Sequence, residues 1–209
     1  MIKFEQIEVW GIKHAIRGMR NPLNSWERSD TVFDGDKMCL GENDIDLMTR
    51  LIRGGAPHRK FLRQIFVSVD ITAPLYWWKE FDTYKVGTTA NSCSTMHKIH
   101  AKEFELADFS TEHLSPLSIN TLKSVIDVMN LERKHYVACK DKDCWWQMIQ
   151  LLPSSYNQKR TVTMTYENLL NMLEYRRGHK LDEWRMFCDW ILTLPYGSLL
   201  KEGVGNEQS

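Results

Sequence analysis

Apolar and polar residues alternate in three stretches of the chain, a pattern typical of β-strands with one buried face. The clearest stretch is Gln64–Thr72, which is rich in β-branched residues and carries an apolar residue at every second position from Ile65. Shorter alternations over Lys3–Trp10 and Arg160–Thr165 predict two further strands. The pattern therefore predicts a small sheet built from segments that are far apart in the sequence.

Helical periodicity covers most of the remaining chain, and the two longest polar stretches, Asn24–Gly41 and Thr88–Thr95, are predicted to be loops. The predicted helices are Lys13–Met19, a helix capped by Asn43 or Asp44 and running through Ile52, an aromatic helix with Pro74 in its first turn and Gly87 beyond its end, Ser115–Met129 continued by Leu131–Leu152, Thr165 or Tyr166 through Arg177, and Asp182–Leu194. We expect an α+β fold, with a small, mainly antiparallel sheet packed against several helices.

Size and composition indicate one globular domain over residues 1–200, followed by a flexible polar tail, 201–209. The net charge is zero, with 27 basic and 27 acidic residues, which argues against a broad nucleic-acid surface but allows a single nucleotide. No apolar run is long enough to cross a bilayer, and the start lacks the apolar core of a signal peptide. The five cysteines are widely spread and odd in number, so we expect reduced thiols in a cytoplasmic protein.

In one stretch Gly54-Gly55 ends a helix, the strand follows, and Ala73-Pro74 opens an aromatic helix. This order of elements resembles that of the flavin-dependent thymidylate synthases. In that family this helix leads into the signature RHRxxSxxxxSxRY. In the register set by Ala73-Pro74, the corresponding residues are Thr83, Tyr84, Lys85, Thr88, Cys93, Thr95 and Met96.

The second stretch lies nearer the C-terminus, where Leu152-Pro153 leads to Lys159-Arg160, a strand, and a helix that ends at Arg176. The family has a phosphate-binding Arg on this strand and another Arg at the end of this helix. The resemblance implies the family's fold, a homotetramer with sites shared between subunits, and a pyrimidine nucleotide of the deoxyuridine monophosphate type as ligand. For an active enzyme it also implies FAD and a folate one-carbon donor, in a methyl transfer to C5 of the pyrimidine.

The signature positions differ in chemistry from the family pattern. Thr83, Tyr84 and Lys85 replace Arg-His-Arg, the group that helps the family to bind flavin, and retain a single positive charge. Asn91 stands where the family has an acidic residue, and Thr95 stands where it has an Arg before the Tyr. Function therefore has to be argued from the residues of the site and not from the fold.

Candidate ligand-binding groups are concentrated between Lys85 and Thr95. Asn91 can donate to a pyrimidine carbonyl and accept from a ring N–H, while hydroxyl groups can hold a sugar or phosphate. The alternative is a solvated loop whose hydroxyls cap turns. The candidates of this segment are Lys85, Thr88, Asn91, Ser92, Cys93, Ser94 and Thr95.

Cys93 is also the candidate catalytic residue, because a thiolate can add to an electron-poor ring carbon. The alternative for Cys93 is an inert or merely hydrogen-bonding thiol. Lys159, Arg160 and Arg176 are candidates for the anion-binding half of the pocket, and the alternative is a solvated charged face.

The remaining chemistry-bearing residues do not make a site by spacing alone. His135, Cys139 and Cys144 are too few and too spread for a typical zinc site, so no metal is expected. Trp77-Trp78 and Trp145-Trp146 each place two large rings side by side, and we expect one ring of each pair to leave apolar surface for a homo-oligomer.

These observations leave three hypotheses. The first is a nucleotide-binding protein on a thymidylate synthase-like scaffold, with a pocket that combines the Thr88–Thr95 segment, Lys159, Arg160 and Arg176. The second is a non-catalytic protein, of a kind suited to a phage, that sequesters a nucleotide or a nucleotide-derived signal. The third is an oligomeric structural protein without a ligand.

Overall fold

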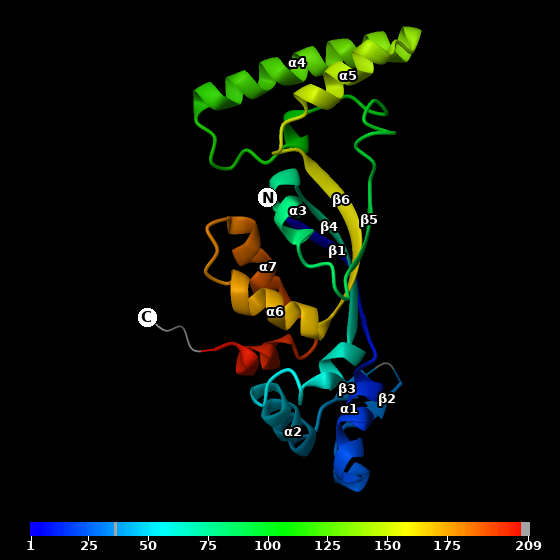
Figure 1. The fold of residues 1–209 in the computed structure, drawn as a ribbon, viewed down its shortest axis with the longest axis vertical. Coiled ribbons are helices and arrows are strands. Elements are labelled where there is room, and N and C mark those ends of the chain that lie inside the picture. Colours follow the sequence, from blue (N-terminus) through cyan, green and yellow to red (C-terminus); the bar gives the residue numbers. More distant parts are fainter. Residues whose placement is uncertain (36, 206–209) are drawn as a thin grey trace. The chain divides into compact units, whose positions relative to one another are not determined.

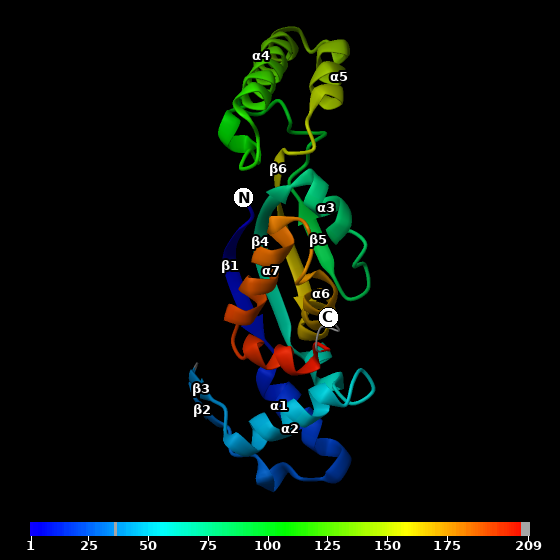
Figure 2. The same cartoon turned by 90° about the vertical axis from the view of Figure 1, so that its left-hand side faces the viewer.

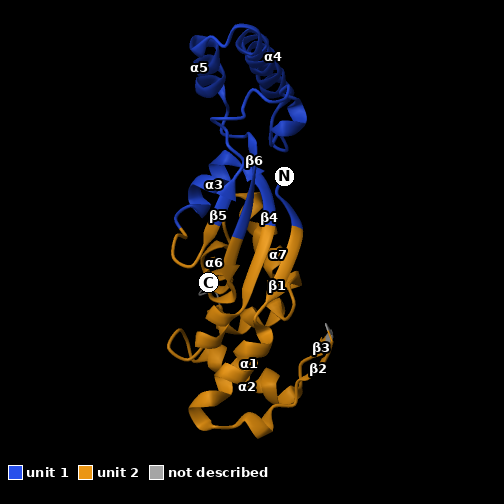
Figure 3. Ribbon diagram, turned by 90° about the vertical axis from the view of Figure 1, so that its right-hand side faces the viewer, with its two compact units in different colours: residues 1–5, 70–83, 90–162 blue, residues 6–69, 84–89, 163–209 orange. Residues whose placement is uncertain are grey.

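The computed structural model describes residues 1–35 and 37–205 of the chain. These residues divide into two compact units, coloured separately in Figure 3. Unit 1 comprises residues 1–5, 70–83 and 90–162, and unit 2 comprises residues 6–69, 84–89 and 163–209. Each strand of the main sheet, or the turn that leads into it, passes from one unit into the other.

The main sheet is antiparallel and has the strand order β1-β4-β6-β5 (Figure 1). Its strands are β1 (Lys3–Trp10), β4 (Phe66–Pro74), β5 (Thr89–Ser92) and β6 (Asn157–Thr165). A separate hairpin is formed by β2 (Val32–Asp34) and β3 (Lys37–Cys39). The expected α+β class is confirmed, and the predicted strands correspond to β1, β4 and β6.

The helices account for most of the remaining described residues. They are α1 (Ile12–Arg20), α2 (Glu42–Arg53), α3 (Leu75–Phe81), α4 (Pro116–Cys139), α5 (Lys142–Leu151), α6 (Tyr166–Arg176) and α7 (Asp182–Thr193). Short 3-10 helices are η1 (Asn21–Leu23), η2 (Trp26–Arg28), η3 (Lys60–Gln64), η4 (Leu106–Asp108) and η5 (Gly197–Gly203). None of the helices in the described ranges is long and apolar enough to cross a membrane.

The alternation in β4 explains its position in the middle of the sheet. Its apolar side chains at every second position, Val67, Val69, Ile71 and Ala73, are fully buried, while the intervening residues are partly exposed. In unit 2, α6 and α7 lie on one face of the sheet (Figures 1 and 2). The core of this unit includes buried Leu169, Leu170, Leu173, Trp184, Phe187 and Ile191.

Unit 1 has its own apolar cluster, where α4 and α5 lie side by side (Figure 2). The cluster consists of Ile99, Phe104, Phe109, Leu122, Ile126, Met129 and Met148. Because α4 buries only one face against it, the rest of this long helix is left exposed.

Two predicted loops contain regular structure. Asn24–Gly41 holds η2 and the β2–β3 hairpin, and Thr88–Thr95 holds β5, an edge strand whose side chains are all exposed. Both predictions were wrong because these strands are only three or four residues long, too short for their sequences to show the alternation that marks a buried strand. Pairing with a neighbouring strand, which is a tertiary contact, fixes them instead.

The predicted helix boundaries are wrong at two places. The cap of α2 is Gly41, because the Asp30 carboxylate accepts hydrogen bonds from the backbone N–H groups of Asn43 (2.9 Å) and Asp44 (3.1 Å). The continuous helix expected up to Leu152 is interrupted at Lys140, which has a left-handed backbone, and α5 starts anew after the Asp141 cap.

The tryptophan pairs differ from each other. Trp77 and Trp78 are both fully buried, packed edge to face with a centroid distance of 4.9 Å, so the expectation that one of them leaves apolar surface is wrong. The short helix α3 therefore buries two neighbouring side chains, which point to different sides of the helix. One of them, Trp78, also donates from its Nε1 to the Gln158 carbonyl at 2.9 Å. Trp146 is 41% exposed, as expected.

Of the predicted tail, 201–203 complete η5 and 206–209 lie outside the described residues.

Candidate functional site

The candidate segment of unit 1 follows the sheet edge. Asn91 and Ser92 are the last residues of β5, and the backbone N–H of Cys93 continues the pairing by donating to the Lys159 carbonyl on β6 at 2.9 Å. Asn91, Ser92, Cys93 and Ser94 are exposed, and Thr95 is partly exposed. The Ser94 hydroxyl accepts from the backbone N–H of His97 at 2.9 Å, so this hydroxyl caps a turn, as the alternative interpretation expected.

Gln158 joins this segment to Arg160. Its Nε2 donates to the Cys93 carbonyl at 2.7 Å, and its Oε1 accepts from the Arg160 Nε at 3.0 Å. The side chain is buried, which makes both hydrogen bonds costly to break. The sequence analysis missed Gln158, and only its position two residues before Arg160, on the same face of a strand, indicated a role.

Arg160 is held in place by three groups. Its guanidinium lies 4.2 Å from the ring centroid of Trp78, and its Nη1 donates to Asp82 at 2.7 Å, in addition to the bond with Gln158. The side chain is 13% exposed, while that of Asp82 is 52% exposed. A guanidinium stacked on a ring keeps its N–H edge fixed in direction, which suits recognition of a planar or tetrahedral anion.

Lys159 is not brought together with Arg160. Neighbouring residues of a strand point to opposite faces, and Lys159 pairs with Asp70 at 3.0 Å and with Glu5 at 3.4 Å. The hydrogen bond to Asp70 raises the pKa of Lys159, and hydrogen bonds from Thr161 and Lys159 lower the pKa of Asp70. Lys159 therefore stabilises the opposite face of the sheet as part of an ion pair.

In unit 2, Arg176 is positioned by two aromatic rings at the C-terminal end of α6. Its Nε donates to the Tyr84 hydroxyl at 2.9 Å, and its guanidinium lies 4.9 Å from the Trp184 ring centroid. Tyr84 and Trp184 pack edge to face at 5.9 Å. Tyr84 occupies the position of the signature histidine, so here this position supports an arginine.

Lys85 and Thr88 lie in the turn after Tyr84. The Thr88 hydroxyl donates to the Tyr84 carbonyl, and the Asn168 Nδ2 donates to the Val86 carbonyl at 2.7 Å. Gly87 has a φ of +77°, which most other residues would adopt only with strain. The turn is therefore fixed by its backbone, and the exposed Lys85 is its one cation.

The residues at the signature positions do not fit a flavin in the way that the family pattern does. The Thr83 hydroxyl donates to the Glu80 carbonyl at 2.7 Å, and the Tyr84 hydroxyl accepts from Arg176. Only Lys85 offers a charge, and a single ammonium group lacks the bidentate geometry of the guanidinium groups that Thr83 and Lys85 replace.

The sequence matches no protein-family model, and it matches no curated protein. Solved structures, in contrast, match along almost the whole chain. Flavin-dependent thymidylate synthase ThyX from Helicobacter pylori, solved with FAD and dUMP, matches in two crystal structures. One has a TM-score of 0.68 at 17% identity, with 96% of this chain and 100% of that chain covered. The other has a TM-score of 0.70 at 16% identity, with 99% and 100% covered.

A third match is PolB, a UMP/dUMP methylase from Streptomyces cacaoi solved with 5-Br dUMP. Its TM-score is 0.60 at 12% identity, with 97% of this chain and 92% of that chain covered. The likeness extends over nearly the full length of each protein, so it describes the whole architecture and not one shared motif. This chain has the fold of the flavin-dependent thymidylate synthases, in a divergent form.

Proposed function

We propose that the protein binds a pyrimidine nucleoside monophosphate of the dUMP type. The observation that carries the proposal is the match along nearly the whole chain to structures that were solved with dUMP or a brominated analogue of it. Residues of this chain add chemical support, because each unit presents one arginine that aromatic rings hold in a fixed direction.

As candidate phosphate ligands we propose Arg160 in unit 1 and Arg176 in unit 2, each taken within its own unit. Charge-assisted hydrogen bonds from guanidinium groups to phosphate oxygens are among the strongest polar contacts in proteins. A phosphate that binds Arg160 would compete with the exposed carboxylate of Asp82, which accepts a hydrogen bond from the Arg160 Nη1 at 2.7 Å. Lys85 and Thr88, in the fixed turn of unit 2, add a cation and a hydroxyl to the proposed ligands.

For the base and sugar we propose the exposed side chains after the start of β5. The Asn91 amide matches the donor and acceptor pattern of a uracil edge, and the hydroxyls of Ser92, Ser94 and Thr95 suit a sugar. Cys93 lies in the middle of this segment with its thiol exposed, and its backbone is fixed by Gln158. Lys159 supports this segment through its backbone, since its carbonyl accepts from the Cys93 N–H, while its side chain remains paired with Asp70.

The resemblance and one surface support a homo-oligomer, which we propose to be a tetramer. Three apolar side chains of α4 are exposed: Leu117 is 78%, Val128 45% and Leu131 52% exposed. They fall on one stripe, at positions i, i+11 and i+14, close to the repeat of helices that pair along their length. The partner that we propose for this apolar stripe is the same stripe on α4 of a second copy of the chain.

A non-catalytic binder is the second candidate, and the signature positions favour it. Thr83 and Tyr84 are engaged by hydrogen bonds within their own units, in place of the family's flavin-binding group. A protein of this kind would sequester its nucleotide. An enzyme would require FAD and a folate donor, and the absorbance spectrum of the purified protein separates the two functions. A flavin spectrum supports methyl transfer, whereas a colourless protein that dUMP stabilises supports the binder.

The test of binding is thermal unfolding with dUMP in wild type and in Arg176→Ala. At about 100 times its dissociation constant, a ligand adds about 2.7 kcal/mol to the free energy of unfolding. We expect the shift in wild type and in Arg177→Ala, the neighbouring exposed arginine, and not in Arg176→Ala. Arg176→Ala also lowers the melting temperature slightly without ligand, because it removes contacts with two rings. An unchanged shift in Arg176→Ala would remove this residue from the site, and no shift in wild type with dUMP, UMP or dTMP would refute the proposed function.

Cys93 is tested separately by alkylation of the native protein. Iodoacetamide at neutral pH should modify Cys93, and dUMP should protect it, if the thiol lines the proposed site. Mass spectrometry of the peptide containing Cys93 measures both effects. Modification that dUMP does not slow would place Cys93 outside the site, and absent modification would exclude a reactive thiol.

A further inference from the structure

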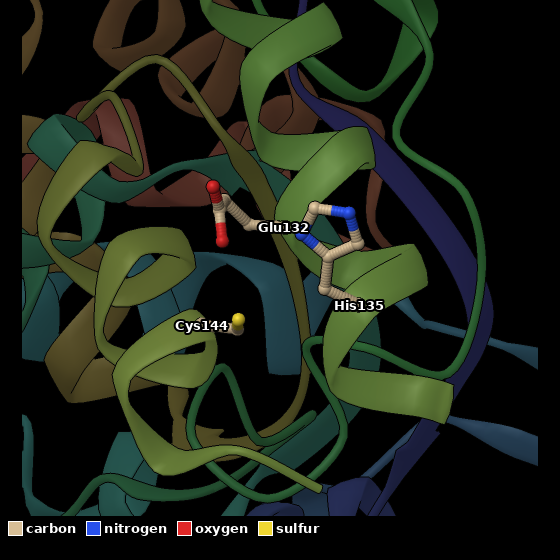
Figure 4. A group of neighbouring side chains, drawn as sticks. All are labelled: Glu132, His135 and Cys144. Carbon is tan, nitrogen blue, oxygen red and sulfur yellow. The ribbon is translucent and has the colours of Figure 1, made fainter. Parts of the chain in front are cut away.

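Three side chains with metal-binding atoms meet between α4 and α5. Glu132 and His135 lie on α4 and Cys144 lies on α5, with the side chains turned toward the space between the helices (Figure 4). One carboxylate oxygen, one imidazole nitrogen and the Cys144 sulfur all lie within 4.8 Å of one another. All three residues belong to unit 1, and none of them belongs to the proposed nucleotide site.

The sequence brings these groups together through the helical hairpin. A spacing of three residues puts Glu132 and His135 on one face of α4. The left-handed Lys140 and the Asp141 cap, whose carboxylate accepts from the Asp143 N–H at 2.9 Å, turn the chain back so that Cys144 faces them. Packing of Met148 and Met129 in the apolar cluster keeps the two helices together.

Cys139 is excluded from the group by its own hydrogen bond. Its Sγ donates to the backbone carbonyl of His135 at 3.0 Å, so the thiol lies along α4. By sequence, the candidates near this hairpin are His135, Cys139 and Cys144. In the structure Glu132, and not Cys139, lies beside His135 and Cys144. No rule of sequence spacing links Glu132 to a cysteine on another helix.

The charge around Cys144 favours a cation. The carboxylates of Glu132 and Asp141 lie near this thiol and give its surroundings a negative potential. Such a potential attracts a dication, which can neutralise the Glu132 carboxylate and a thiolate together.

We propose that Glu132, His135 and Cys144 bind a thiophilic divalent metal ion of the zinc class, with a fourth position taken by water. Oxygen, nitrogen and sulfur ligands of this kind are the usual set for Zn²⁺, at about 2.0–2.3 Å from the ion. A tetrahedral site brings such atoms to within about 3.3–3.8 Å of one another, so modest rotamer changes close the observed group. His135 is exposed and Glu132 is partly exposed, which leaves both free to make that change. The ion would join α4 to α5 beyond their apolar cluster.

The test uses the full chain, stripped with a chelator and titrated with Co²⁺ as a spectroscopic substitute for Zn²⁺. We expect one equivalent of Co²⁺ to give a thiolate-to-cobalt charge-transfer band and the visible bands of a tetrahedral ion, and Zn²⁺ to displace it. Cys144→Ser should abolish the charge-transfer band, whereas Cys39→Ser, an exposed cysteine of unit 2, should keep it. Glu132→Gln and His135→Ala should each weaken binding at least tenfold, and His97→Ala should not.

Circular dichroism of each variant without metal shows whether it folds, and the conservative Cys144→Ser and Glu132→Gln changes retain the size of their side chains. A charge-transfer band that survives in Cys144→Ser overturns the proposal, as does the absence of any Co²⁺ band in folded wild type. Equal metal affinity in wild type and Glu132→Gln would show that Glu132 is not a ligand, and this would refute the three-ligand site.

Discussion

The ion pair between Arg20 and Asp44 is the most deeply buried charge contact that the described residues of unit 2 show. Arg20 Nε donates to Asp44 Oδ1 at 2.7 Å, and the two side chains are 4% and 0% exposed. Asp44 also accepts from Ser29 at 2.7 Å and from Thr31 at 2.6 Å. All of these hydrogen bonds join α1 and the 29–31 segment to the start of α2.

Replacing Arg20 with Met should lower the free energy of unfolding by about 3–5 kcal/mol, because it leaves a buried carboxylate without its counter-charge. Urea denaturation at neutral pH measures the change. The matched control is Arg50→Met, which breaks an exposed pair with Asp46 at 2.9 Å and should cost less than about 0.5 kcal/mol. Equal losses in the two variants would show that the buried pair contributes no more than a surface pair.

Asp44 also makes stability depend on pH. Burial alone would raise its pKa, but hydrogen bonds from Thr31, Ser29 and Arg20 outweigh burial and hold the pKa below its ordinary value of 3.8. The stabilisation is complete above the unfolded pKa and is lost as the pH falls through the lower folded pKa, that is, below about pH 4.

Asp44→Asn should therefore be less stable than wild type at neutral pH and should lose less stability on acidification from pH 5 to about pH 3. Urea denaturation across this range measures both quantities, with Asp46→Asn as the exposed control. A parallel pH dependence in Asp44→Asn and wild type would contradict the lowered pKa.

Cys188 should resist alkylation that reaches the exposed cysteines. It is 1% exposed, and burial raises its pKa to about 12, with the charge of Asp189 adding to the effect. Because the thiolate is the reactive form, native protein at neutral pH should keep Cys188 unmodified under conditions that modify Cys39 and Cys139. Peptide mass spectrometry before and after denaturation measures this, and rapid native labelling of Cys188 would show that its helix opens locally.

For single residues, the sequence indicates residue types but not their partners. Arg176 is a candidate through the family resemblance, yet its contacts with Tyr84 and Trp184 depend on how distant segments pack. Lys159 and Arg160 are candidates together through the same resemblance, although adjacent residues of a strand point to opposite faces. Gln158 and Glu132 were missed since a buried glutamine and a helical glutamate carry no signal of their own.

Gly11 controls how β1 connects to α1. It has a φ of +89°, and a Cβ at this position would lie 2.1 Å from the Gln64 carbonyl oxygen. Gly11→Ala should therefore lower the free energy of unfolding by about 2 kcal/mol or more, from strain and the displaced backbone together. The control is Gly178→Ala, which meets no atom within 4 Å and should be neutral. Thermal denaturation of both variants measures the difference, and a neutral Gly11→Ala would mean that the turn relaxes.

Elements whose own sequence carries their pattern were predicted well. The buried alternation of β4 and the Thr165 cap of α6, which accepts from the Asn168 N–H at 3.3 Å, are local signals. β5 depends on the neighbouring strand β6, and the break between α4 and α5 depends on Asp141 competing with helix continuation. The pairing of β5 is a long-range contact that one sequence does not reveal, whereas the Asp141 cap is a local contact.

The proposed oligomer can be tested at the exposed apolar stripe of α4. Native mass spectrometry should report a tetramer for wild type, and Leu131→Asp should shift the population to smaller species, because a charge in an apolar helix interface costs several kcal/mol. Leu131 is 52% exposed in the single chain, so the variant should fold normally.

The matched control for the interface is Leu23→Asp, at a residue that is 81% exposed and lies on η1. It should leave the subunit number unchanged. If Leu131→Asp remains a tetramer, the stripe on α4 is not the interface. If wild type is a monomer, the exposed stripe has another role, and a nucleotide site has to be complete within one chain. Subunit number and nucleotide binding therefore need to be measured on the same preparation, since a monomer that dUMP still stabilises would separate ligand binding from assembly.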